Sequence, residues 1–138
     1  MNDRCAAGTG KFLEIMATSL QIPIVQFGDF ALRADKQVRI SSKCTVFAES
    51  EATSLMGRGE RPENIAMGLH LAIAERTMAM LNRVGLEHPL CFAGGVAQNH
   101  CVVKLLQKRI GERIIVPEQP DMVGALGAAM HGALQRNR

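Results

Sequence analysis

The segment from Pro62 to Val84 most constrains the fold, because its apolar residues recur at helical spacing over a long stretch. Proline suits the first position of a helix, where its missing N–H has no partner to lose. Gly85 follows directly, and glycine favours the left-handed cap that ends many helices. The sequence therefore predicts one long helix over residues 62–84.

The composition is that of a globular domain of 138 residues, with 47% hydrophobic and 21% charged residues. The net charge is only +3 and the basic residues are scattered, and the chain has no Trp or Tyr on which bases would stack. We therefore expect no nucleic-acid partner. No apolar run is long enough to span a bilayer, and no signal-peptide pattern is present, so we also expect no membrane contact and a cytoplasmic protein.

The other elements are predicted from apolar spacing and from the positions of Gly and Pro. Helices are expected over residues 9–20, 24–32, 46–56, 99–110 and 122–135, a short extended piece over 37–41, and buried strands over 89–93 and 113–116. The strand, glycine turn, helix, strand and helix at the C-terminal end form a βαβ-like unit and indicate the α/β class. In α/β sheets ligands bind beyond the carboxyl ends of the strands, where Gly94 and Gly95 fall.

The last predicted helix carries Gly124, Gly127 and Gly132 among alanines. Because these residues have little or no side chain, we expect this helix to pack very closely against a sheet or a ligand.

Four cysteines occur, at positions 5, 44, 91 and 101, and none forms a CxxC pair, so neither a zinc ribbon nor a thioredoxin-type site is indicated. Without a secretory signal, a disulfide framework is not expected. Cys5 and Cys44 each stand just before a predicted helix, whose free N–H groups and dipole stabilise an anion such as a thiolate. Cys91 is expected in the core, and Cys101, in a first helical turn, is a weaker candidate for reactivity.

The residues after Cys5 also favour a close approach by a ligand or another backbone. Gly8 and Gly10 lack a Cβ, and Thr9 between them is suited to cap the helix that follows. Taken alone, the pattern slightly favours a capped helix beside a buried thiol over an anion site.

Four motifs together resemble one known family. They are Asn2-Asp3-Arg4-Cys5-Ala6-Ala7-Gly8-Thr9-Gly10-Lys11-Phe12, Ser41-Ser42-Lys43-Cys44-Thr45-Val46-Phe47-Ala48-Glu49-Ser50-Glu51, Phe92-Ala93-Gly94-Gly95-Val96-Ala97-Gln98-Asn99 and Gly124-Ala125-Leu126-Gly127-Ala128-Ala129. The chain is similar over nearly its whole length to the activator component of 2-hydroxyacyl-CoA dehydratases, in the BadF/BadG/BcrA/BcrD ATPase group.

This resemblance implies part of an actin/hexokinase/Hsp70-like ATPase fold, helix-rich with a small sheet. It implies a homodimer that holds one [4Fe–4S] cluster between its subunits, with Cys5 and Cys44 of each subunit as the metal ligands. The full-length parent would bind ATP or ADP with Mg, and ATP would drive the transfer of an electron from a low-potential donor to an acyl-CoA dehydratase or a benzoyl-CoA-type reductase.

The resemblance also assigns nucleotide contacts. Gly94 and Gly95 correspond to the adenosine loop, and Gly8, Thr9 and Gly10 would approach the ribose and phosphates. Glu49 would accept hydrogen bonds from ribose hydroxyls, with a solvated helix carboxylate as the equal alternative. No catalytic residue is assigned.

In the family, phosphate-binding loops and acidic metal-binding residues come before the first cysteine motif. This sequence has no counterpart of them. We therefore expect residues 1–138 to be a single C-terminal ATPase-type domain of a larger activator, not competent in ATP hydrolysis by itself. Gln98 stands where a lysine is expected in many relatives. A sugar-kinase-like nucleotide-binding domain, which needs no paired cysteines, and a non-catalytic interaction module with buried thiols are the alternatives.

Overall fold

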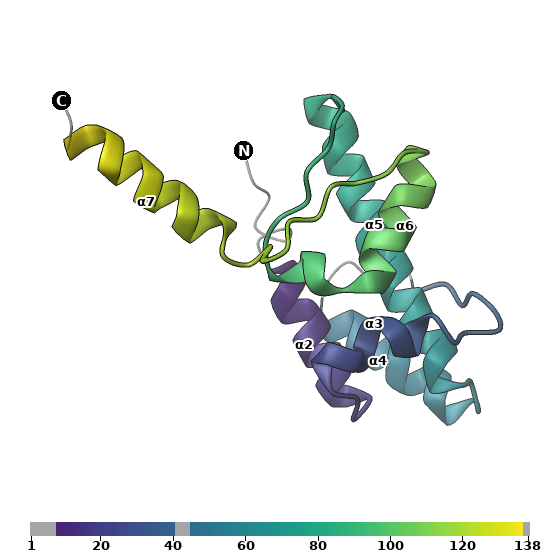
Figure 1. Ribbon diagram of the computed structural model, residues 1–138. Coiled ribbons are helices and arrows are strands. Elements are labelled where there is room, and N and C mark those ends of the chain that lie inside the picture. Colours follow the sequence, from purple (N-terminus) through teal and green to yellow (C-terminus); the bar gives the residue numbers. More distant parts are fainter. Residues whose placement is uncertain (1–7, 41–44, 137–138) are drawn as a thin grey trace.

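The computed structural model describes residues 8–40 and 45–136, which are mainly helical (Figure 1). The elements are α2 (Thr9–Ser19), α3 (Ile24–Ala31), α4 (Thr45–Gly57), α5 (Pro62–Val84), the 3₁₀ helix η1 (Gly95–Gln98), α6 (His100–Ile110) and α7 (Val123–Arg136). All six predicted helices are present, with ends within one or two residues of the expected positions.

Helix α5 is the centre of the fold, since α2, α3, α4 and α6 all contact it. Its predicted start at Pro62 and last residue at Val84 are both confirmed. The side chains that the helices bury between them are mostly aliphatic and aromatic, and the largest fully buried apolar ones are Phe27, Met16, Ile65, Leu69, Ile73, Leu106 and Val102. Removing this apolar surface from water is the main force holding the helices together.

Helix ends follow the sequence signals in part. Asn99 caps α6 as expected, its Oδ1 accepting from the Val102 N–H at 3.1 Å, and Gly111 ends that helix in the left-handed conformation. Gly85 has a positive φ of 85° but a ψ of 137°, so it is not the left-handed cap that was predicted. Thr9 is not a cap either, because Gly8 occupies the N-cap position of α2.

The two predicted buried strands are wrong in length, and their burial is confirmed only in part. Among the described residues, the 89–93 and 113–116 segments are joined by one isolated parallel bridge between Cys91 and Ile115. The Phe92 N–H donates to the Ile115 carbonyl and the Ile115 N–H to the Leu90 carbonyl, both at 2.9 Å. One face of this pair contacts the helical core, through Leu90, Phe92 and the buried Ile114. Cys91 and Ile115, the alternate residues, are exposed, so Cys91 is not a core residue. Apolar runs alone do not say whether one face of a segment or both faces are covered.

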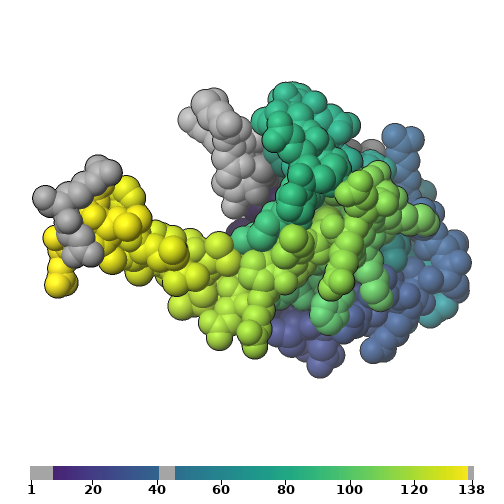
Figure 2. Space-filling view, turned by 45° about the horizontal axis from the view of Figure 1, so that its top comes forward, coloured from purple at the N-terminus to yellow at the C-terminus, as the bar shows by residue number. Residues whose placement is uncertain are grey.

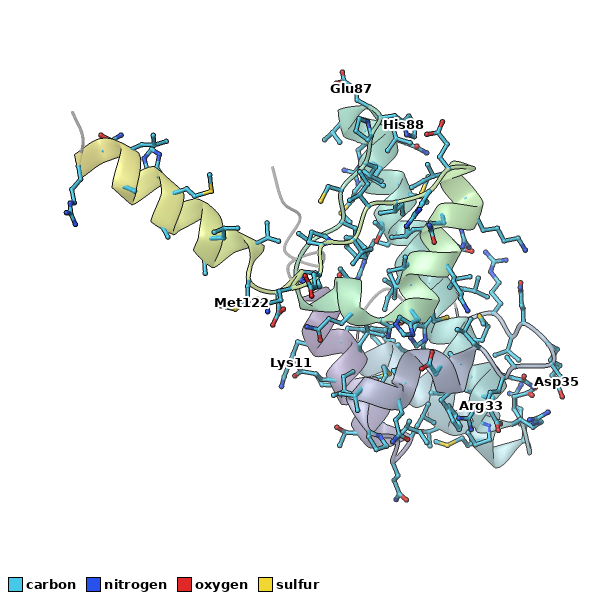
Figure 3. All side chains as sticks on the ribbon, in the orientation of Figure 1. Lys11, Arg33, Asp35, Glu87, His88 and Met122 are labelled. Atoms are coloured by element: carbon cyan, nitrogen blue, oxygen red, sulfur yellow. The ribbon has the colours of Figure 1, made fainter. Side chains whose placement is uncertain are left out.

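The loop over residues 33–40, predicted to be partly extended, contains no strand. It is held instead by Asn64 of α5, whose buried Oδ1 accepts from the backbone N–H groups of Asp35 and Lys36 at 3.1 and 3.4 Å. Figure 3 shows Arg33 and Asp35 at this end of the molecule, far from Glu87 and His88 at the opposite end of α5.

Helix α7 projects away from the other helices, as Figures 1 and 2 both show. It has no buried residue, and a Cβ added at Gly124, Gly127 or Gly132 would meet nothing within 4 Å. The expected close packing of this helix is therefore not found among the described residues. One stripe of the helix and the residue before it is apolar and exposed, formed by Met122, Leu126, Met130 and Leu134. None of the helices in the described part of the chain is both long enough and apolar enough to cross a bilayer.

Candidate functional site

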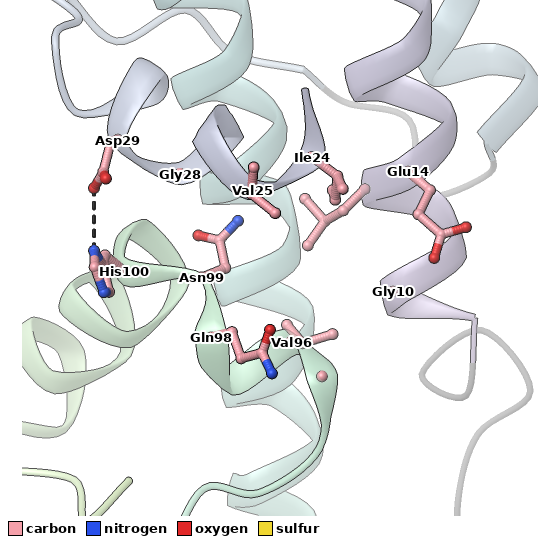
Figure 4. Close-up of a pocket in the computed structure, with 12 residues that line it drawn as sticks. Gly10, Glu14, Ile24, Val25, Gly28, Asp29, Val96, Gln98, Asn99 and His100 are labelled. Carbon is pink, nitrogen blue, oxygen red and sulfur yellow. Dashed lines mark hydrogen bonds and ion pairs between the residues drawn. The ribbon is translucent and has the colours of Figure 1, made fainter. Parts of the chain in front are cut away.

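A cavity of about 480 Å³ lies where α2, α3 and the turn leading into α6 meet (Figure 4). Helix α2 contributes Gly10, Leu13 and Glu14; helix α3 contributes Ile24, Val25, Gly28 and Asp29; and the segment around η1 contributes Gly95, Val96, Gln98, Asn99 and His100. Pockets for small ligands have volumes of roughly 300–1,000 Å³, so this one is of suitable size.

At Gly10 and Gly95 the cavity is lined by main-chain atoms, because glycine has no side chain. A Cβ added at Gly10 would lie 3.6 Å from Val96 Cγ2, and one added at Gly95 would meet nothing within 4 Å. A ligand can therefore approach the main chain of α2 and η1 without meeting a side chain at these positions. Gly10 and Gly95 lie far apart in sequence and are brought together only by the fold.

The chemistry of the remaining wall is apolar with acidic edges. Leu13, Ile24, Val25 and Val96 supply aliphatic surface, and Val25 is 85% exposed at the lip. Glu14 and Asp29 are the charged carboxylates, and Asp29 Oδ1 lies 3.2 Å from His100 Nδ1 in an exposed pair, drawn as a dashed line in Figure 4. None of the lining residues is Lys or Arg, so the cavity suits an uncharged, flat group with hydroxyls better than a phosphate.

Sequence reasoning missed the contribution of α3 to this cavity. Ile24, Val25 and Gly28 form one side of it, yet locally they show only an amphipathic helix. It also missed His70, whose fully buried imidazole contacts Asn99 behind the cavity wall, with 3.0 Å between His70 Nε2 and Asn99 Nδ2. A histidine on a helix with many apolar residues gives no sequence signal that distinguishes such a contact from core filling.

The other predicted nucleotide residues surround the cavity without lining it. Gly94 has a φ of 95° and donates its N–H to the Pro120 carbonyl at 2.7 Å, so it orients the turn that Gly95 begins. Gly8 and Thr9 start α2, and Thr9 Oγ1 accepts from Arg76 Nη2 of α5 at 3.2 Å. The first turn of α2 therefore stands at the edge of the cavity through Gly10.

Glu49 lies elsewhere. It is exposed on α4 and lines a second hollow of about 510 Å³, together with Lys11 and the C-terminal part of α2. Glu14 and Ile24 border both hollows, so the two are neighbours. The proposed role of Glu49 as a ribose ligand stays a prediction.

The predicted metal ligands Cys5 and Cys44 lie outside the described residues. The helices that follow them in sequence, α2 and α4, contact each other. Within residues 8–40 and 45–136, no group of three or more His, Cys, Asp and Glu side chains gathers as a metal site would require. Cys101, the weaker reactive candidate, is fully buried, and burial raises the pKa of its thiol to about 12, so it is not a reactive cysteine.

Comparison with known proteins identifies the family. Residues 1–132 match the model of the BadF/BadG/BcrA/BcrD ATPase family. The chain belongs to this family. The family resemblance and the ATPase fold expected from the motifs are thus confirmed, with a small sheet represented here by the single bridge.

Relatives with curated names in the BadF/BadG/BcrA/BcrD family are about twice as long. The chain is 40% identical over 131 residues to the 2-hydroxyisocaproyl-CoA dehydratase activator of Clostridioides difficile, covering 95% of this chain and 49% of that protein. It is 41% identical over 131 residues to the (R)-2-hydroxyglutaryl-CoA dehydratase activating ATPase of Acidaminococcus fermentans, covering 95% of this chain and 50% of that protein. The chain thus spans about half the length of these relatives.

A solved structure of a BadF/BadG/BcrA/BcrD relative superposes closely. The activator of the 2-hydroxyisocaproyl-CoA dehydratase from Clostridium difficile, solved with bound ADPNP, matches with a TM-score of 0.88 at 37% identity. The match covers 99% of this chain and 53% of that one.

Proposed function

We propose that this chain is the nucleotide-contacting and cluster-binding part of an ATP-dependent activator that delivers low-potential electrons to an acyl-CoA dehydratase or a benzoyl-CoA-type reductase. The observation that carries the proposal is the cavity between α2, α3 and η1, which brings Gly10 and Gly95 together. It occurs in a chain whose solved relative was crystallised with a bound ATP analogue.

The cavity is proposed to hold the adenine and ribose. Its aliphatic side chains from α2, α3 and η1 suit the faces of a base, and the carboxylates of Glu14 and Asp29 suit hydroxyl and amine donors. The phosphates would lie outside the cavity, beside the first turn of α2. Gly8, Thr9 and Gly10 form the start of α2, where the positive end of the helix dipole favours anionic oxygens.

The cluster is proposed to lie between two copies of the activator. A [4Fe–4S] cluster takes four thiolates, and Cys5 and Cys44 from each of two subunits supply that number. The chemistry that a bound cluster supplies is one-electron transfer at low potential. Helix α4 begins directly after Cys44 and α2 begins four residues after Cys5, so the positive ends of both helices would stabilise the negative charge of thiolates and cluster.

The nucleotide part is tested by filling the cavity. Gly95→Leu places a side chain where the structure has open space, and Gly95 is not in a positive-φ conformation, so the backbone tolerates the change. Gly57→Leu makes the same change at the end of α4, where a Cβ also meets nothing and no cavity residue lies. Calorimetric titration with ADP should show binding by wild type and Gly57→Leu and none by Gly95→Leu. Equal affinities of the two variants would reject the cavity as the site.

The cluster part is tested by iron and sulfide analysis after anaerobic reconstitution. Wild type and Cys91→Ser should both bind about four irons per dimer, whereas Cys5→Ser and Cys44→Ser should lose them. Cys91 is the matched control because it is exposed and lies away from α2 and α4 in sequence. A folded, dimeric wild type without iron would refute the cluster assignment and favour a kinase-like nucleotide-binding domain.

A further inference from the structure

His70 is a fully buried histidine whose hydrogen-bonding state is fixed by its surroundings. It lies on α5 with its ring centroid 4.9 Å from that of Phe27 of α3. Its Nδ1 is 2.7 Å from the Ala66 carbonyl oxygen, which only accepts, so Nδ1 carries the proton and donates. Burial lowers the pKa of His70 to about 4, so the ring is neutral at neutral pH and Nε2 is an acceptor.

That acceptor faces Asn99. Asn99 Nδ2 lies 3.0 Å from His70 Nε2, and Asn99 Oδ1 accepts from the Val102 N–H at 3.1 Å. The Asn99 nitrogen thus donates to His70 Nε2, and its oxygen accepts from the Val102 N–H. Turning the carboxamide over would break both hydrogen bonds, so only one orientation is favourable. The side chain is further confined by α3, because a Cβ on Gly28 would stand 2.6 Å from Asn99 Oδ1.

Asn99 is also the end of the turn that forms a wall of the cavity. Its N–H donates to the Val96 carbonyl at 3.0 Å, closing η1, and its side chain lines the cavity beside Gln98 and His100 (Figure 4). The glycines that begin this turn are exposed, and Ala97 is the buried residue within it. The turn is thus held at its start by the Gly94 N–H bond to the Pro120 carbonyl and at its end by Asn99.

We propose that His70 is a positioning residue for the nucleotide: by accepting a hydrogen bond from Asn99, it fixes the Asn99 carboxamide and, with it, the η1 turn in the cavity wall. The inference rests on the proposed function of this cavity as the nucleoside site. A core-filling role alone would be served by an apolar side chain of similar size, without the cost of burying a polar ring. Two satisfied ring nitrogens offset that cost here and join α5 to the turn before α6.

Two substitutions at His70 separate positioning from packing. His70→Leu fills the space but offers Asn99 no acceptor, whereas the amide oxygen of His70→Gln falls near the position of Nε2 and restores one. Ile73→Ala is the control. Ile73 is 2% exposed on the same helix, its side chain has no hydrogen-bonding group, and it is not one of the residues that line the cavity. All three lower stability, and only His70→Leu should alter the cavity.

The readout is calorimetric titration with ADP together with the free energy of unfolding. His70→Leu should weaken ADP binding about tenfold, the size expected from one lost hydrogen bond, while His70→Gln and Ile73→Ala stay within about threefold of wild type. An unchanged affinity of His70→Leu, with stability lost as in Ile73→Ala, would show that His70 serves packing alone.

A second measurement needs no nucleotide. The side-chain amide of Asn99 should give a proton-exchange-protected NMR signal in wild type and in His70→Gln, and lose that protection in His70→Leu. If the Asn99 side-chain amide has the same protection in His70→Leu as in wild type, the positioning role is refuted even if ADP binds. Absence of ADP binding by wild type, with the NMR result as expected, would instead refute the proposed function of the cavity.

Discussion

Gly28 and Asn99 are packed so closely that a single methyl group on Gly28 would stand 2.6 Å from Asn99 Oδ1 and 3.0 Å from its Cγ. Because that oxygen caps α6 through Val102 and the nitrogen of the same amide contacts His70, the side chain cannot turn aside without losing both hydrogen bonds. Glycine at position 28 thus allows α3 and the start of α6 to form the cavity together.

We predict that Gly28→Ala weakens ADP binding about tenfold and that Gly68→Ala does not, as measured by calorimetry. A Cβ on Gly68 would lie 2.7 Å from the Val38 carbonyl oxygen, in the loop over residues 33–40 and away from the cavity lining. Both substitutions overpack the interior and should cost roughly 1–3 kcal/mol of unfolding free energy in urea. Equal affinities for the two variants would mean that the Gly28–Asn99 contact does not shape the site.

We predict a stability loss in mild acid caused by His70. Its folded pKa of about 4 lies below the ordinary value of 6.5, so the unfolded chain binds more protons between these pH values. Stability is therefore fully present above pH 6.5 and falls as the pH drops toward 4, by about 3 kcal/mol for this group. Urea unfolding of wild type and His70→Gln across this window checks it. Between pH 4 and 6.5 the free energy of unfolding should rise more steeply with pH in wild type than in His70→Gln, and above pH 7 the two pH dependences should be alike. The same pH dependence for both proteins at every pH would contradict the prediction.

We predict that this chain binds adenosine nearly as well as ATP, within about tenfold, because the cavity would hold the nucleoside and the start of α2 adds only a partial charge for the phosphates. Competition calorimetry with adenosine, ADP and ATP measures the ratio. The variant Glu14→Gln removes the carboxylate that borders both hollows and should improve ATP binding more than adenosine binding. A much larger preference for ATP would contradict the prediction, because it would require phosphate-binding groups in this chain stronger than the start of α2.

We predict that removing residues 123–138 leaves the unfolding free energy of the remaining helices within about 0.5 kcal/mol, because α7 has no buried residue. Leu126→Glu should likewise leave stability unchanged and reduce self-association of the chain at high concentration, since it places a charge in the middle of the exposed apolar stripe. Thermal unfolding and sedimentation velocity measure the two effects. Ser50→Glu, an exposed change on α4, serves as the control for added charge alone.

The sequence by itself determined the helices and the family of this protein. Pro62, Asn99 and Gly111 set helix ends through local chemistry, namely a missing N–H, a capping oxygen and a left-handed backbone, which act whatever the rest of the chain does. The four motifs were likewise sufficient to name the BadF/BadG/BcrA/BcrD ATPase family, and the match over residues 1–132 bears that out.

Only the tertiary structure decided burial and the composition of the cavity. Cys91 and Ile115 lie in apolar runs, yet they are exposed, because only the alternate residues Leu90 and Ile114 contact the helical core. Which face is covered is a relation between distant segments. Gly10 and Gly95 were expected at a nucleotide, but Gly28 and His70 had no local signal, because their importance lies in distances to Asn99. Periodicity and caps act over a few residues, whereas a cavity exists only once separate helices have packed.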